Sequence, residues 1–293
     1  MKNIKFIDLF CGIGGFHLGL QRAAHNLGVR SQSVLSSDID RFAKAAYIKN
    51  FPESVSHFKD DVKLIDSSSI ENFDILCAGF PCQTFSQIGS RQGFNDNNRG
   101  NLFFEISRFL EEKRPSAFFL ENVRFIVKHD NGKTLETIIN IVNKLNYTFD
   151  YKVIKAYEFG LPQNRPRAYM VGFDKKKFGN VEFEFPTGEN RLMKPLSQLL
   201  EVDWCEKEIG YTLRVSGRGS KYGDRHNWDG YKVRRDGEEF ILRLTPEQGK
   251  RMMGFPEDWI TGPSVTQSMK QLGNSVAVPV IEDIAQKIIE RIM

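Results

Sequence analysis

The chain has 293 residues, enough for one large hydrophobic core or two modest domains. Its hydrophobic content of 40% and charged content of 27% are those of a soluble globular protein, and no apolar run is long enough to span a bilayer. The first residues contain neither a long apolar segment nor a small-residue cleavage site, so we expect no signal peptide and a cytoplasmic protein. The net charge of +4 is a weak indication of a polyanionic partner.

The first half of the chain predicts alternating strands and helices. Residues 4–10 are an apolar run of strand length, and a helical period begins at Phe16 and ends before Gly28. The further elements that we expect are a strand at 33–36, a helix at 41–50, a strand at 73–79, a helix at 102–113, a strand at 117–120, a helix at 133–145, and strands at 152–156 and 168–173. This alternation predicts a parallel α/β sheet with helices on both faces.

The second half is less regular. After residue 185 the chain becomes rich in loops, glycine, arginine and aromatic residues, and order returns in the last thirty residues with an amphipathic helix at 281–293. We therefore predict three parts. Residues 1–184 form a catalytic and cofactor-binding domain, residues 185–262 form a small recognition domain with a hinge, and residues 263–293 return to the first domain.

The cysteines and histidines indicate no metal site. Cys11, Cys77, Cys82 and Cys205 form no CxxC pair, and the five histidines are scattered along the chain. Structural zinc sites need clustered ligands, so we expect no metal. Four cysteines in a chain of this length do not indicate a disulfide scaffold either, and we expect free thiols.

A glycine-rich turn between the first strand and the first helix indicates a cofactor site. The run Phe10-Cys11-Gly12-Ile13-Gly14-Gly15 lets a ligand approach the backbone closely, although it differs from the GxGxxG dinucleotide pattern. Asp38 follows the predicted strand at 33–36, and we expect Asp61 at the end of a third strand, so one carboxylate can accept hydrogen bonds from ribose hydroxyls and the other from an adenine amino group. The alternative interpretation of both acids is helix capping and turn formation.

Cys82 is the candidate nucleophile. It lies in Phe80-Pro81-Cys82-Gln83, just past a buried strand, and the carboxyl ends of such strands line the ligand crevice of an open α/β sheet. A cysteine is otherwise most often a small buried apolar residue. The thiol needs positive charge or a base nearby, because its ordinary pKa is about 8.5.

Three residues are candidates to support that chemistry. Arg165 and Arg167 supply positive charge from a neighbouring strand end. Glu121 follows the strand at 117–120, and a half-buried carboxyl there would hydrogen-bond or protonate a heterocycle nitrogen. The alternative for Glu121 is a structural ion pair, for example with Arg165.

Taken together, these motifs closely resemble the DNA cytosine-C5 methyltransferases. The order and spacing match over nearly the whole chain except residues 185–239, and the ordered set of glycine turn, PCQ, ENV, QxRxR and GNS is highly specific. The matching segments are Phe6–Leu20, Asp74–Phe85, Asn101–Val123, Tyr157–Gly172, Arg243–Pro256 and Gln271–Val278. The resemblance implies a Rossmann-like, doubly wound sheet that binds S-adenosyl-L-methionine and releases S-adenosyl-L-homocysteine.

The resemblance also implies the roles of individual residues. Cys82 would add to C6 of a flipped-out cytosine while Glu121 engages N3 and the exocyclic amine, and Arg165 and Arg167 would orient the base or the catalytic groups. The implied cofactor residues are Phe10, Gly12, Gly14, Gly15, Asp38, Ile39, Asp61, Val62, Phe80, Leu102, Asn274 and Val276. Ile39 departs from the family, in which a larger aromatic residue is frequent at this position.

Two segments are implied to contact duplex DNA. Residues 83–100 would form a loop that closes over the extruded base, with Ser86, Ile88 and Arg91 on the DNA. Residues 211–235 carry seven Lys or Arg side chains against Asp224 and Asp229, a net charge of +5 that exceeds the +4 of the whole chain. From this stretch we expect Arg214, Arg218, Lys221 and Arg225 to contact DNA, the alternative being a solvated charged face.

Two further functions remain open from the sequence. A tRNA cytosine-C5 methyltransferase would share the catalytic motifs, and an inactive DNA-binding relative would share the scaffold. A nicotinamide-dependent dehydrogenase is disfavoured because the GxGxxG turn is absent. The length suggests a monomeric enzyme of a restriction–modification system, with a separate cognate endonuclease.

Overall fold

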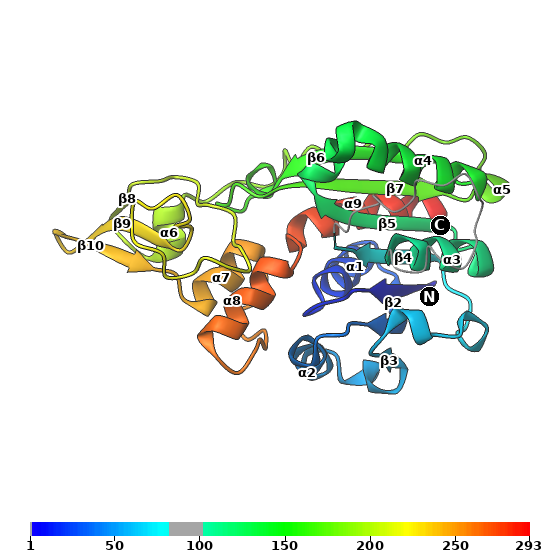
Figure 1. The fold of residues 1–293 in the computed structure, drawn as a ribbon, viewed down its shortest axis with the longest axis horizontal. Helices are drawn as coiled ribbons and strands as arrows, with labels where there is room; N and C mark the ends of the chain where they lie inside the picture. Colours follow the sequence, from blue (N-terminus) through cyan, green and yellow to red (C-terminus); the bar gives the residue numbers. More distant parts are fainter. Residues whose placement is uncertain (1, 82–101) are drawn as a thin grey trace.

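The computed structural model describes residues 2–81 and 102–293. Its main feature is a seven-stranded sheet in the order β3-β2-β1-β4-β5-β7-β6 (Figure 1). The strands are β1 (Asn3–Leu9), β2 (Arg30–Ser37), β3 (Phe58–Lys59), β4 (Ile75–Gly79), β5 (Ala117–Val123), β6 (Asp150–Lys155) and β7 (Pro166–Phe173). This architecture confirms the expected Rossmann-like doubly wound fold.

The prediction of an all-parallel sheet was wrong at one strand. β7 is antiparallel to both β5 and β6, whereas the other neighbouring strands are parallel. Only residues 156–165, with one short 3-10 helix, join β6 to β7. A parallel pair needs a crossover of a dozen or more residues, so this short connection makes the chain reverse its direction.

Helices cover both faces of the sheet. On one face, α1 (Gly15–Asn26) packs along α9 (Val278–Ile292), and a Cβ at Gly19 would lie 2.5 Å from Ile281. On the other face lie α3 (Leu102–Lys113) and α4 (Lys133–Lys144). Successive residues of β4 point into these two cores, which explains why the strand is an uninterrupted apolar run.

A smaller lobe extends from one side of the sheet (Figure 1). It contains an antiparallel sheet of β8 (Trp204–Cys205), β9 (Gly230–Arg235) and β10 (Glu238–Arg243), in the order β10-β9-β8. The helices α6 (Leu196–Leu200), α7 (Pro246–Met253) and α8 (Val265–Asn274) accompany it. Its core includes Trp228 and Tyr231 and is continuous with Ile13 of the large lobe, so the two lobes share one packed cluster.

The remaining elements are short and serve as connections. They are α2 (Arg41–Asn50), α5 (Lys175–Phe178) and the 3-10 helices η1 (Pro52–His57), η2 (Val62–Leu64), η3 (Ser67–Ser69), η5 (Arg124–Val127), η6 (His129–Gly132) and η7 (Ala156–Phe159). Asp40 begins α2 by accepting hydrogen bonds from the amides of Phe42 and Ala43. Across the two described ranges, no helix combines the length and the apolar character that a membrane span requires.

Candidate active site

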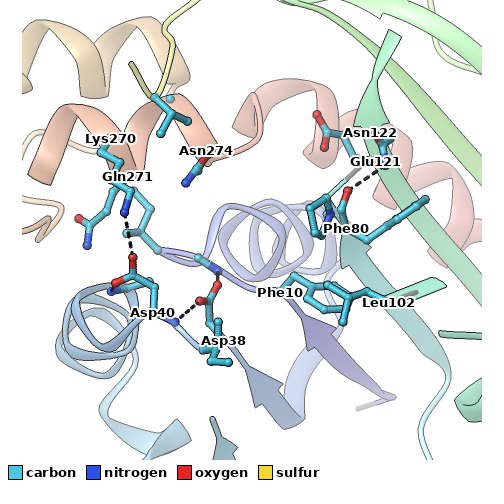
Figure 2. A pocket seen from close by; sticks show the side chains of 18 of the residues that line it. Phe10, Asp38, Asp40, Phe80, Leu102, Glu121, Asn122, Lys270, Gln271 and Asn274 are labelled. Atoms are coloured by element: carbon cyan, nitrogen blue, oxygen red, sulfur yellow. Dashed lines mark hydrogen bonds and ion pairs between the residues drawn. The ribbon is translucent and has the colours of Figure 1, made fainter. Parts of the chain in front are cut away.

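A cleft of about 700 Å³ opens where the carboxyl ends of β1, β2, β4 and β5 meet the smaller lobe. Figure 2 shows Asp38 and Asp40 on one side of this cleft and Glu121 with Asn122 on the other. The cleft gathers the predicted residues Phe10, Gly12, Asp38, Ile39, Asp61, Val62, Phe80, Leu102, Glu121, Arg165, Arg167, Arg214 and Asn274. Residues from all three predicted parts of the chain therefore meet in one place.

The glycine turn between β1 and α1 supports the floor of the cleft. Gly12 has a φ of 55° and nothing within 4 Å of the position where a Cβ would stand, so its backbone is open to a ligand. A Cβ at Gly14 would lie 2.4 Å from Phe51, and one at Gly15 would lie 2.6 Å from Val276. Gly14, Gly15 and Val276 thus pack beneath the turn and do not line the cleft.

Asp38 is held by two backbone amides. Its Oδ2 accepts a hydrogen bond from Gly12 at 2.8 Å and its Oδ1 accepts one from Asp40 at 2.8 Å. Burial raises the pKa of Asp38 above its ordinary value, and the two hydrogen bonds offset only part of this effect. Each oxygen keeps a second lone pair, so the oriented carboxyl can still accept ligand hydroxyls.

Apolar side chains line the cleft around Asp38. Ile39 is 79% exposed, although it is a large apolar residue, and Phe10, Phe80 and Leu102 also line the cleft (Figure 2). Asp61 caps η2 by accepting a hydrogen bond from the amide of Lys63 at 2.9 Å, yet it also lines the cleft. The capping interpretation of Asp61 is therefore correct, and it leaves a ligand role open.

Lys270 and Asp40 belong to this cleft, although the sequence analysis did not single them out. Lys270 Nζ lies 3.5 Å from Asp40 Oδ2, so an ion pair joins α8 to the start of α2. The two residues are far apart in the sequence, and no local motif indicates that they meet. The nearest signal is Asn274, which lies one helical turn from Lys270 on the same face of α8.

Glu121 is the buried acid of the cleft. It lies inside β5, opposite Tyr169 of β7, because the strand continues beyond its predicted end at residue 120. Its Oε1 is 2.9 Å from Arg167 Nε, so the ion pair is with Arg167 and not with Arg165 as we considered. Burial raises the pKa of Glu121, and Arg167 and Arg165 lower it. Oε1 is buried against Arg167, and the residue as a whole lines the cleft.

Asn122 fixes the chain that leads to Cys82. Its side-chain amide donates a hydrogen bond to the carbonyl oxygen of Phe80 at 2.8 Å, and its Oδ1 accepts one from the amide of Val123 at 2.8 Å. Cys82, Ser86, Ile88 and Arg91 lie outside the described residues. The last described residue before them, Pro81, lines the cleft.

Arg165 joins three segments of the chain. Its guanidinium donates hydrogen bonds to the carbonyl oxygens of Leu213 at 3.1 Å and Gly273 at 2.9 Å, and also to that of Ser275. Burial, with a contribution from Arg167, lowers the pKa of Arg165 to about 9. The donors of Arg165 are thus largely committed to the backbone at the C-terminal end of α8 and just after it, and to the residue that precedes Arg214.

The four basic residues predicted in the smaller lobe have different environments. Arg214 lines the cleft, and Arg218 lies 3.8 Å from the buried carboxylate of Asp229. Lys221 and Arg225 are exposed. Neither of these two side chains has a hydrogen-bond or ion-pair partner in the part of the chain that the structure describes.

The sequence matches a known family along almost its entire length. The model of the C-5 cytosine-specific DNA methylase family matches residues 4–215 and 206–290. Type II methyltransferase M1.ScrFI from Lactococcus lactis subsp. cremoris is 40% identical over 98% of this chain and 78% of its own length. M.SsoII from Shigella sonnei is 41% identical over 97% of this chain and 80% of its own length. M.HhaI from Haemophilus parahaemolyticus is 35% identical over 98% of this chain and 95% of its own length.

Solved structures show the same fold at lower sequence identity. DNMT2 from Spodoptera frugiperda superposes with a TM-score of 0.74 at 19% identity, covering 98% of this chain and 99% of that one. The methyltransferase EhMeth from Entamoeba histolytica gives a TM-score of 0.75 at 19% identity over the full length of both chains. With its cleft, its buried Glu121 and its matching sequence, the chain belongs to the C-5 cytosine-specific DNA methylase family.

Proposed function

We propose that this DNA cytosine-C5 methyltransferase modifies a cytosine that has been flipped out of a specific duplex DNA sequence, through a covalent bond between Cys82 and C6. The observation that carries the proposal is the buried carboxyl of Glu121, which is paired with Arg167 and lines the same cleft as Pro81, the residue before Cys82. Chemistry on a base requires such extrusion from the duplex.

The cleft residues fit S-adenosyl-L-methionine. The oriented Asp38 carboxyl suits ribose hydroxyls, and the exposed Ile39 offers an apolar surface for adenine. Asp61 would accept a hydrogen bond from the adenine amino group. The open backbone at Gly12 leaves room for the methionine part of the cofactor, and Asn274 lines the same cleft. When bound, this cofactor supplies the electrophilic methyl group and leaves as S-adenosyl-L-homocysteine.

The reaction on the base then follows from the protein groups. The Cys82 thiolate forms a bond to C6, and Glu121 stabilises the charge that develops at N3. C5 becomes electron-rich and accepts the methyl group, after which loss of the C5 proton breaks the bond from sulfur to C6. Arg167 orients Glu121 through their ion pair. Arg165 acts indirectly, because its hydrogen bonds hold the backbone around the site.

Methyl transfer from radiolabelled S-adenosyl-L-methionine tests this proposal directly. We expect label in a mixed-sequence plasmid duplex and none in bulk tRNA, with the same rate in the presence of a metal chelator. Label in tRNA alone would establish the tRNA methyltransferase instead, and label in neither nucleic acid would identify an inactive DNA-binding protein. A loss of activity with the chelator would contradict the expected independence from metal.

Replacing Asp38 by alanine should weaken cofactor binding more than DNA binding. The change removes the acceptor for the ribose hydroxyls and frees the Gly12 turn, so we expect the Kd for the cofactor to rise about tenfold or more. Calorimetric titration with S-adenosyl-L-homocysteine measures this effect. Asp60→Ala is the matched control, because Asp60 also lies at the cleft but forms an exposed ion pair with Lys44. Equal affinities of the two variants would contradict the ribose role of Asp38.

The family also suggests a biological setting. We propose that the enzyme acts as a monomer on cytoplasmic, nucleoid DNA, and protects it from a separate cognate endonuclease in a restriction–modification system. The relatives named above are Type II methyltransferases, which supports this setting. Residues 185–262, which contain the three-stranded sheet, would then be the part that recognises the DNA sequence.

A further inference from the structure

Residues 214–228, here called the recognition segment, fold around one buried carboxylate that the mechanism does not use. Asp229 is fully buried immediately before β9, at the open end of the β9–β10 hairpin, where Gly230 pairs with Arg243. Arg243 Nη1 donates a hydrogen bond to its Oδ1 at 2.9 Å, and Arg218 Nε lies 3.8 Å from its Oδ2. The amide of Gly219 also points to this carboxylate, 3.2 Å from Oδ1 and 3.3 Å from Oδ2.

Further hydrogen bonds tie the first part of the recognition segment to the same point. Trp228, which is buried, donates from its indole nitrogen to the carbonyl oxygen of Ser216 at 2.8 Å. Arg243 also donates to the carbonyl oxygen of Ser220, and Arg218 donates to that of Leu244 at 3.3 Å. Asp229 and its neighbours thus fix residues 216–220 from several directions.

The second part of the recognition segment presents its cations to solvent. Two consecutive turns place Lys221 and Arg225 on the surface. In the first, the amide of Asp224 donates to the carbonyl oxygen of Lys221, and in the second the amide of Asn227 donates to that of Asp224. The Asp224 carboxylate accepts hydrogen bonds from the backbone and ring nitrogens of His226 at 2.7 and 2.9 Å, so its direct partner is not one of these cations. Lys221 and Arg225 keep their full hydrogen-bonding capacity for a ligand.

We infer that Asp229 is a positioning residue for sequence recognition: it retains Arg218 and Arg243 as scaffold, and leaves Lys221 and Arg225 to contact the DNA. This inference rests on the proposed role of residues 185–262 in DNA recognition. A buried carboxylate with two arginines fixes a loop in one shape, because moving either arginine leaves a charge without its partner. A loop of one shape selects among base sequences more sharply than one that adapts to each.

The number of cations that reach phosphates can be measured from the salt dependence of DNA binding. Each phosphate contact changes the slope of log K against log salt by about 0.9. We expect Arg225→Ala and Lys221→Ala each to make the slope shallower by about 0.9, and Arg218→Ala to leave it within about 0.3. These three side chains lie at the surface or only partly buried, so the comparison does not depend on a change in the packed core.

Asp229→Asn tests the positioning role itself. The amide keeps the shape of the side chain but no longer neutralises Arg218 and Arg243, which then become available to phosphates. We expect the salt slope to steepen by about one unit and the preference for the cognate duplex over a duplex with one changed base pair to fall about tenfold or more. The cognate sequence is first determined by bisulfite sequencing of plasmid DNA that the wild-type enzyme has methylated.

Asp224→Asn is the matched control, since it removes the same charge from an exposed position in the recognition segment. It should preserve sequence preference, and cofactor affinity should be unchanged in both variants, which confirms that the large lobe is folded. An Asp224→Asn variant that loses sequence preference as Asp229→Asn does would show that only net charge matters and would overturn the inference. A shallower slope for Arg218→Ala, equal to that of Arg225→Ala, would overturn it as well.

The results that would contradict the proposed function differ from those that would contradict the role of Asp229. If the wild-type protein transfers methyl groups to DNA while none of the three cation variants changes binding, residues 185–262 are not the recognition part, and the inference falls with that assignment. If the wild-type protein binds no duplex DNA, the proposed substrate itself is wrong.

Discussion

Replacing Cys82 by serine is expected to reduce methyl transfer below detection while the Kd for S-adenosyl-L-homocysteine stays within about twofold of the wild-type value. A hydroxyl at this position is a far weaker nucleophile than a thiolate, so C6 is not attacked and C5 is not activated. The cofactor contacts that we propose for Asp38, Ile39 and Gly12 come from other elements and should be unaffected. Single-turnover transfer of labelled methyl groups to plasmid DNA measures the effect.

A second measurement isolates the covalent step. On duplex DNA that contains 5-fluorocytosine, the wild-type enzyme should form an adduct that survives denaturing electrophoresis, because the C5 substituent cannot be lost and the bond to sulfur cannot break. Cys205→Ser is the matched control, since Cys205 is a half-buried thiol of the smaller lobe outside the cleft. This variant should form the adduct as the wild type does. A wild-type enzyme that methylates DNA but never forms the adduct would rule out the covalent route.

Glu121→Gln should lower the rate of methyl transfer by about 10²–10⁴-fold, the range typical of a lost acid–base group. Burial, offset by Arg167 and Arg165, raises the pKa of Glu121, so this carboxyl keeps its proton to a higher pH than an ordinary glutamate does. In the proposed mechanism, the protonated form is the one that donates a hydrogen bond to N3. Activity that depends on it is therefore present below the raised pKa and falls as the pH rises through it.

The pH dependence distinguishes this role from a structural one. The Cys82 thiolate makes the rate rise with pH, and Glu121 makes it fall at higher pH, so kcat/KM of the wild type should follow a bell-shaped profile. Glu121→Gln should lose the falling limb and keep the rising one. Glu105→Gln is the control, because Glu105 is also buried and pairs with an arginine, Arg108, but lies on α3 outside the cleft. A falling limb that persists unchanged in Glu121→Gln would contradict the acid role.

Local patterns predicted much of the fold. The bounds of α2 and α3 agree with their predicted ranges because each helix has an amphipathic period, and α2 also has an acidic cap at its start. The direction of β7 was not predictable from its own residues, since a buried strand has the same composition whichever way it runs. The connection at residues 156–165 decides that direction, and its shortness is the signal that could have been used.

The site could be predicted only as far as motifs reach. Asp38 and Glu121 were identified because their segments match known patterns, and the structure brings both to one cleft. Arg167, the partner of Glu121, was not identified as such. The pair depends on the register of β5 and β7, which places Val123 opposite Arg167 and which only the assembled sheet fixes. Lys270 was missed for a similar reason: its ion pair with Asp40 depends on how α8 lies against α2.

The three carbonyl oxygens held by Arg165 set a rule for exchanging recognition domains between relatives. A donor domain would have to return its backbone to the position of Leu213, and the acceptor would have to keep glycine at 273, where a Cβ would lie 2.7 Å from the backbone of Arg214. Grafts joined beyond this junction, after Val215 and before Leu244, would leave these three hydrogen bonds in place. The exchangeable part of this enzyme would therefore begin at residue 216, two residues after Arg214 at the cleft, and new sequence specificities would best be introduced from there outward.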